Sequence, residues 1–133
     1  MPKYMLDTNM CIYLMKNQPE SVARRFADCI VGDVVMSAIT FAELEYGVAV
    51  SRDPERERAN LDALAEMILI APFNREAARS YGPLRKASRE RRQDHLDKLI
   101  AAHAVALCVT LVTNDLRHFQ GYPGLRIENW LDR

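Results

Sequence analysis

Near the start of the chain lies Lys3-Tyr4-Met5-Leu6-Asp7-Thr8-Asn9, a short apolar run that ends at a carboxylate. Its length and composition predict a buried strand, after which Thr8 is placed to cap a helix reaching about Lys16. Similar apolar runs predict further strands at 34–37, 68–71, 110–113 and 125–128. Strands that alternate with helices indicate an α/β fold, a three-layer α/β/α arrangement around a parallel sheet of about four to five strands.

The intervals between these runs have helical periodicity. Thr40 and Glu43 have the T-x-x-E spacing of a capping box, which would open the helix after the second strand. Gly82-Pro83 should kink or interrupt a helix over 75–92. The remaining helices are predicted after Thr8, from Pro19 to Gly32, from Asp53-Pro54 to Met67 and over 96–108.

Length and composition limit the class of protein. A chain of 133 residues is the size of one domain, taken here as 1–133. With 18 basic and 18 acidic residues, bulk charge favours neither nucleic acid nor membrane. No apolar run reaches the roughly 20 residues that span a bilayer, and the N-terminus does not resemble a signal peptide. Three widely spaced cysteines predict a reducing compartment, the cytoplasm, rather than a disulfide framework.

Four carboxylates stand out by their positions. Asp7 and Asp115 follow predicted strands, and the carboxyl ends of parallel strands are where such sheets bind ligands. Glu43 and Asp97 lie among apolar neighbours within predicted helices, where an uncompensated charge is costly. If the fold brings the four together, they form a set of hard oxygen ligands suited to Mg²⁺ or Mn²⁺.

Each of these acids also has a local explanation. Asp97 could stabilise the first turn of a helix capped by Asp94, and a capping box accounts for Glu43. Asp7 and Asp115 could be ordinary turn residues. These readings do not explain why all four fall at one edge of the sheet, and the site hypothesis therefore depends on the cluster.

Polar neighbours near the same edge are secondary candidates. Asn9 and Thr113 would add neutral oxygens that orient a water or satisfy backbone groups. His103 lies mid-helix among alanines and is predicted to be buried or to face a partner. His95 and His118 have no ligand spacing with a cysteine or with each other, which argues against zinc.

Basic residues cluster just before Asp97. Between residues 79 and 98 seven cations face three carboxylates. Such a run is usually a solvated helix face, but beside an acidic metal site it would suit a phosphodiester substrate. The candidates for RNA contact are Arg85, Lys86, Arg89, Arg91 and Arg92.

The chain resembles PIN-domain ribonucleases, and most closely the VapC toxins of bacterial toxin–antitoxin pairs. The resemblance covers the chain in order and rests on five strings. These are MLDTN at 5–9, SAITFAELEYG at 37–47, LDKLIAAHA at 96–104, LVTND at 111–115 and PGLRIENW at 123–130.

This resemblance implies a type II toxin, a Mg²⁺-dependent endoribonuclease that cuts tRNA or rRNA by metal-activated water. Mn²⁺ is expected to substitute. The metal ligands would be Asp7, Glu43, Asp97 and Asp115, with Thr8 and Thr113 as support. The resemblance also implies a homodimer, a cognate VapB-type antitoxin that binds near the helical pair at 40–68, and no membrane partner.

Two other functions remain open at this point. A receiver-like phosphoacceptor domain also has a parallel sheet and binds Mg²⁺, but it needs an acid after a middle strand, where Ile70-Ala71-Pro72 offers none. A catalytically silent module with the same fold would bind a partner protein only. The intact acids argue against that alternative.

Overall fold

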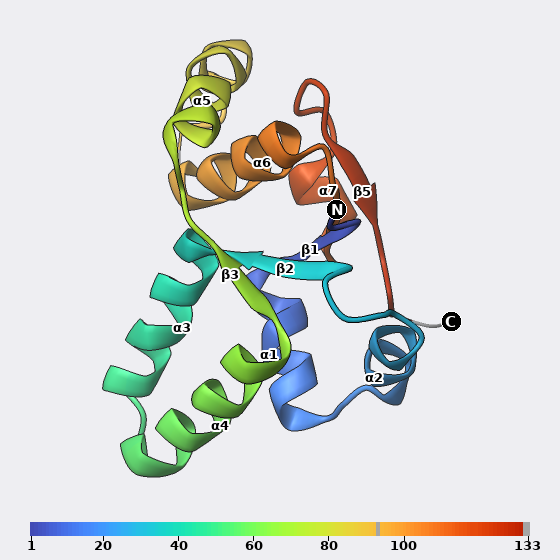
Figure 1. Ribbon diagram of the computed structural model, residues 1–133. Coiled ribbons are helices and arrows are strands. Elements are labelled where there is room, and N and C mark those ends of the chain that lie inside the picture. The colour runs from blue at the N-terminus through green and yellow to red at the C-terminus, as the bar shows by residue number, and fades with distance from the viewer. Residues whose placement is uncertain (93, 132–133) are drawn as a thin grey trace.

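The computed structural model describes residues 1–92 and 94–131, and its centre is a five-stranded parallel sheet (Figure 1). The strand order is β3-β2-β1-β4-β5, with β1 in the middle. This confirms the predicted parallel α/β fold. A receiver domain has the order 2-1-3-4-5, so this topology excludes the receiver alternative. The strands are β1 Tyr4–Leu6, β2 Val34–Ser37, β3 Leu69–Ala71, β4 Thr110–Val112 and β5 Arg126–Glu128.

The strand register determines which residues meet at the carboxyl edge. Leu6 in β1 pairs with Val112 in β4, and the N–H of Asp7 donates to the Val112 carbonyl at 3.0 Å. Because the next residues along both strands leave the sheet at the same level, Asp7 and Thr113 emerge side by side. The sheet therefore brings together residues more than a hundred positions apart.

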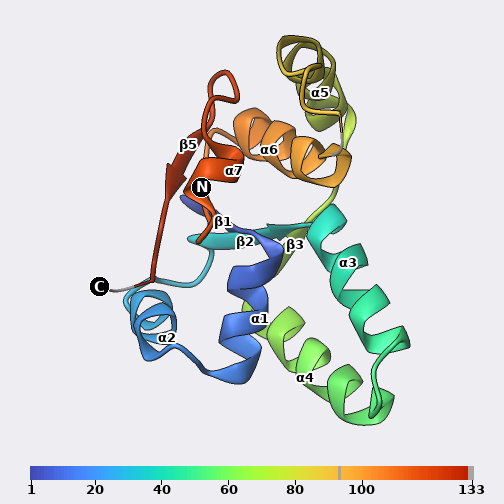
Figure 2. The same cartoon turned by 180° about the vertical axis from the view of Figure 1, so that it is seen from behind.

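Helices cover both faces of the sheet, as Figures 1 and 2 show from opposite sides. Helices α1 to α4 lie on one face, and α5 to α7 lie on the other, which gives the predicted three layers. None of the helices within the described residues is long and apolar enough to cross a membrane. The helices are α1 Thr8–Lys16, α2 Glu20–Ala27, α3 Ala38–Ala49, α4 Pro54–Met67, α5 Arg75–Ala87, α6 His95–Leu107 and α7 Leu116–Phe119.

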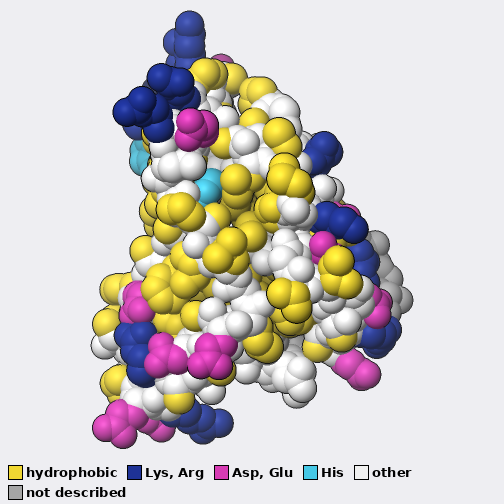
Figure 3. All heavy atoms as spheres, viewed as in Figure 1, with side chains coloured by type: hydrophobic (Ala, Val, Ile, Leu, Met, Phe, Trp, Pro, Cys, Tyr) yellow, Lys and Arg dark blue, Asp and Glu magenta, His cyan; other side chains and the backbone are white. Residues whose placement is uncertain are grey.

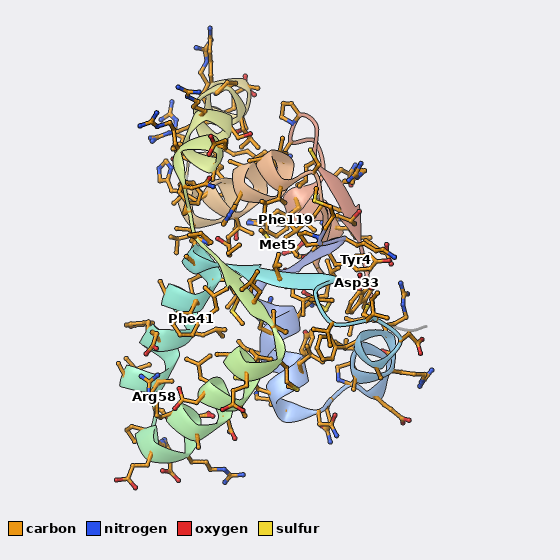
Figure 4. The ribbon with its side chains drawn as sticks, viewed as in Figure 1. Tyr4, Met5, Asp33, Phe41, Arg58 and Phe119 are labelled. Carbon is orange, nitrogen blue, oxygen red and sulfur yellow. The ribbon has the colours of Figure 1, made fainter. Side chains whose placement is uncertain are left out.

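Two apolar cores, one on each side of the sheet, hold these layers together. Alternate residues of the central strand serve both: Leu6 packs with Met10 below, whereas Met5 packs with Leu111 and Phe119 above. Figure 4 shows Met5 and Phe119 between the sheet and the upper helices. A strand buried on both faces is continuously apolar, which is the pattern expected of β1.

Several local predictions were wrong. Asp7, not Thr8, is the N-cap of α1, and Ser37 rather than Thr40 caps α3. The proposed capping box is therefore absent, because Thr40 lies inside the helix. Helix α5 continues through Pro83 without interruption and ends at Ala87, before the predicted limit. The one-turn helix α7 was not predicted.

Trp130, shortly after β5, packs into the apolar core on the α1 to α4 side of the sheet. It is 2% exposed, its ring meets Tyr4 edge-on at 5.2 Å, and Arg25 lies 5.4 Å from the ring centroid. Replacing Trp130 with alanine is expected to destabilise the protein by about 3 to 5 kcal/mol through the cavity it leaves. Urea unfolding measures the loss; a change below about 1 kcal/mol would contradict this packing role.

Candidate active site at the carboxyl edge of the sheet

The four candidate carboxylates line one depression of about 220 Å³ at the carboxyl edge of the sheet. Asp7 follows β1, Asp115 follows β4, Glu43 lies on α3 and Asp97 lies in the first turn of α6. Thr8 and Asn9 line the same depression, together with His118. The structure thus brings together residues from four separate segments.

Asp7 is the most enclosed of the four, with 5% of its surface exposed. One of its oxygens accepts a hydrogen bond from the N–H of Met10 at 2.9 Å, which fixes the carboxylate as the N-cap of α1. Burial raises its pKa to about 6, and the negative charges of Asp97 and Asp115 add to the rise. Hydrogen bonds from Thr113 and Met10 act in the opposite direction. A cation in the depression would relieve this strain between like charges.

Thr113 links two of the acids. Its fully buried hydroxyl oxygen accepts from the N–H of Asp115 at 3.0 Å. Thr113 is also hydrogen-bonded with Asp7, and because an ionised carboxylate only accepts, the Thr113 hydroxyl donates to it. Asp115 in turn caps α7 by accepting from the N–H of His118 at 3.1 Å. The predicted supporting role of Thr113 has a clear geometric basis here.

Glu43 is fixed by Thr8, whose hydroxyl donates to its Oε1 at 2.7 Å. This contact joins the first turn of α1 to α3. Since the capping box is absent, the local explanation of Glu43 loses its support. Thr8 therefore orients a carboxylate rather than capping its own helix.

His103 holds the start of α3 in place from behind the site. It is 1% exposed, and its Nδ1 lies 2.8 Å from the hydroxyl oxygen of Ser37, the residue that caps α3. Burial lowers the pKa of His103, while a hydrogen bond with the Pro72 backbone opposes the change. The prediction that His103 is buried is confirmed.

His118 is the site residue that sequence reasoning missed. Its Nε2 is hydrogen-bonded to Asp97 and lies 3.6 Å from an oxygen of Asp94. Burial opposes its charged form, but the contact with Asp97 and the charges of Asp94 and Asp115 outweigh burial and raise the pKa of His118. A search for cysteine and histidine spacing could not find it. The capping position of Asp115, three residues earlier, was the available signal.

The candidate RNA-binding residues differ in their surroundings. Arg85, Lys86, Arg89 and Arg92 are exposed, and Figure 3 shows Lys and Arg side chains gathered over the upper end of α5. Arg91 is instead half-buried, and its guanidinium donates to the His118 carbonyl at 3.0 Å and to that of Gln120. Four of the five predicted RNA-contact residues thus present their charges to solvent, whereas Arg91 is occupied by backbone carbonyls.

The donor set suits a hard divalent cation. Carboxylate oxygens and one imidazole are the groups available, and the described residues bring no cysteine into the depression. Ligand atoms of Asp94, Asp97 and His118 lie within 4.8 Å of one another, which gives a second grouping that shares Asp97. A bound cation would offset the negative charges of Asp97 and Asp115, which add to the effect of burial in raising the pKa of Asp7.

The sheet order differs from that of a receiver domain, and the acid-lined carboxyl edge is the kind of site in which a metal-dependent hydrolase of the α/β class holds its ion. A family model for the PIN domain matches residues 4–125. The chain belongs to the PIN-domain family, and within it to the VapC ribonucleases. The relatives that support this assignment match the chain over nearly its whole length.

Two curated relatives illustrate the match. The tRNA(fMet)-specific endonuclease VapC of Salmonella typhimurium is 37% identical over 98% of this chain and 99% of its own length. Ribonuclease VapC2 of Rickettsia felis is 35% identical over 96% of this chain and 97% of its own.

Solved structures agree with these relatives. The DNA-bound VapBC of Salmonella typhimurium superimposes with a TM-score of 0.91 at 37% identity, covering 98% of this chain and all of that one. VapBC2 of Rickettsia felis, bound to a promoter DNA fragment, gives 0.86 at 34% identity, covering 96% of this chain and 98% of that one.

Proposed function

We propose that this VapC ribonuclease cuts tRNA, or a similarly folded RNA, with Mg²⁺ or Mn²⁺ held by Asp7, Glu43, Asp97 and Asp115. The observation that carries the proposal is the convergence of these four carboxylates, from four separate segments, on one depression. The name of the Salmonella relative, a tRNA-specific endonuclease, supports the choice of tRNA.

When bound, the ion supplies Lewis acidity: it activates water and neutralises charge on the phosphodiester. The residues of the chain hold the carboxylate ligands in a fixed orientation. Met10 and Thr113 hold Asp7, and Thr8 holds Glu43, so these oxygens are oriented before any ligand arrives. The hydrogen bond from His118 restrains Asp97. The exposed cations near the end of α5 would attract and orient the RNA backbone.

An antitoxin of the VapB type is the proposed protein partner, since the solved relatives are VapBC complexes. A groove between α1, α3 and α4 adjoins the acidic depression and shares Thr8 and Glu43 with it. A segment lying in the groove would reach the acids and block them. The apolar residues of the groove include Ile12, Met15, Leu44, Val48 and Leu61. The homodimer stays a prediction.

The test compares RNA cleavage by the wild type, Asp7→Ala and Asp97→Ala, each with Mg²⁺ and with EDTA. Cleavage should need the ion and should fall by at least about 100-fold in each variant. Activity that persists in EDTA, or in both variants, would exclude the proposed mechanism. An unchanged fold with no Mn²⁺ binding by calorimetry would instead favour the silent protein-binding module.

A further inference from the structure

Lys98 is a buried cation in α6 beside Asp97. It is 1% exposed, and its ammonium donates to the carbonyl of Ser88 at 2.9 Å and to that of Arg91. Within the described part of the chain no carboxylate forms an ion pair with it. A buried ammonium needs strong compensation, and Ser88, at the C-terminal end of α5, offers it from a helix dipole. Lys98 therefore fixes residues 88–92, here called the basic turn.

Arg91 fixes the basic turn from its other side. Its guanidinium donates to the carbonyls of His118 and Gln120, and it lies 4.6 Å from the ring centroid of Tyr122. The approach is close: a Cβ at Gly121, whose φ is +92°, would lie 3.1 Å from an Arg91 nitrogen. Glycine is thus needed there for both space and backbone conformation.

These contacts close a ring that includes the acidic depression. Adjacent residues of α6 face different ways: Asp97 faces the depression and Lys98 faces the basic turn. Arg91 joins that turn to α7, and His118 of α7 returns to Asp97. Any movement of the basic turn would therefore disturb its contacts with both α6 and α7.

We propose that Lys98 and Arg91 are positioning residues that hold the basic turn beside the acidic depression, so that Arg89 and Arg92 contact phosphates of a folded RNA next to the bond that is cut. This inference rests on the proposed function. Arg91 acts through its fork of N–H groups on backbone carbonyls, whereas Arg89 and Arg92 act as exposed charges. A lysine can replace a charge but not such a fork.

The test uses this difference between arginine and lysine at two neighbouring positions. Binding of a fluorescein-labelled tRNA anticodon stem-loop is measured in EDTA over a range of salt concentrations. Arg91→Lys should raise the dissociation constant about tenfold, because the loosened turn must become ordered when RNA binds; the salt slope should stay unchanged, because Arg89 and Arg92 still reach their phosphates once the complex has formed. Arg89→Lys keeps the charge on the phosphate and should therefore weaken binding less than Arg91→Lys does, while Arg89→Ala should lower the salt slope by about one.

Lys98→Met, of similar length but uncharged, should raise the RNA dissociation constant in the same way as Arg91→Lys. Calorimetry with Mn²⁺ should give wild-type affinity for both variants, since all the acids remain. If Lys98→Met does not fold, as judged by circular dichroism, Arg91→Lys alone carries the test.

Wild-type RNA binding by Arg91→Lys would overturn the proposal, as would a loss of Mn²⁺ affinity equal to the loss of RNA affinity. Because binding is measured without cleavage, failure of the proposed function is seen separately. It would appear as a wild type that binds the RNA but does not cut it with Mg²⁺ or Mn²⁺.

Discussion

Replacing Asp7 with asparagine is expected to abolish RNA cleavage and, at the same time, to make the metal-free protein more stable. The pKa of Asp7 in the fold is about 6, against 3.8 for the free side chain. A raised pKa means that stability is fully present below pH 3.8 and is lost as the pH rises through 6. At pH 7 the charged form therefore destabilises the fold, by at most about 3 kcal/mol for such a shift. Asparagine removes the charge and still caps α1.

Urea unfolding in EDTA measures this effect at pH 7 and pH 4. The gain from Asp7→Asn should appear at pH 7 and vanish at pH 4, where the wild-type carboxyl is protonated. Asp53→Asn is the matched control, because Asp53 is an exposed N-cap of α4. It should change stability by less than about 0.5 kcal/mol and leave cleavage intact. An Asp7→Asn protein less stable than the wild type at pH 7 would contradict the electrostatic account.

Manganese binding is expected to weaken at least tenfold between pH 7 and pH 5. A proton on Asp7 competes with the ion, and with a pKa of about 6 the carboxyl is mostly protonated at pH 5. Protonation of His118 acts in the same direction. The hydrogen bond with Asp97 that raises the pKa of His118 also holds a carboxylate oxygen that the ion would otherwise bind. Loss of the proton from either group therefore strengthens Mn²⁺ binding as the pH rises.

Isothermal titration in two buffers of different ionisation enthalpy measures affinity and proton release together. Proton release should increase as the pH falls from 7 towards 6. An affinity that stays constant from pH 7 to pH 5 would show that Asp7 is not a ligand. Asp53→Asn again serves as the control and should follow the wild-type pH profile.

The sheet could be predicted from the sequence because buried parallel strands are short, apolar and bounded by turns. The strands around Met5, Val35 and Leu111 carry no charged residue that would suggest another structure. Asp7 and Asp115 followed from the geometry of such a sheet. The helix caps were less predictable, because serine, threonine and aspartate compete at adjacent positions. Sequence spacing predicted Thr8 and Thr40 as N-caps. In the structure the N-caps are instead the residues at the ends of β1 and β2, Asp7 and Ser37.

Tertiary contacts explain what the sequence could not show. Helix α7 has only one turn and lacks a periodic apolar face, and it is held by Asp115 and by burial of Phe119. His118 enters the site through that turn. The sequence gives no reason to distinguish Arg91 from Arg92, yet Arg91 contacts backbone carbonyls and Arg92 is exposed. Only the fold of the chain around 118–122 separates them.

One oxygen of each acid in the depression is already held by a donor from the protein, from Met10 for Asp7, Thr8 for Glu43 and His118 for both Asp97 and Asp115. An ion that enters would join four segments whose order is set by folding, much as a cross-link does. The unfolded chain offers no such convergence, and a bound ion would therefore raise the free energy of unfolding in proportion to the logarithm of its concentration. The oxygen atoms that bind the ion would then also stabilise, reversibly, the fold that brings them together.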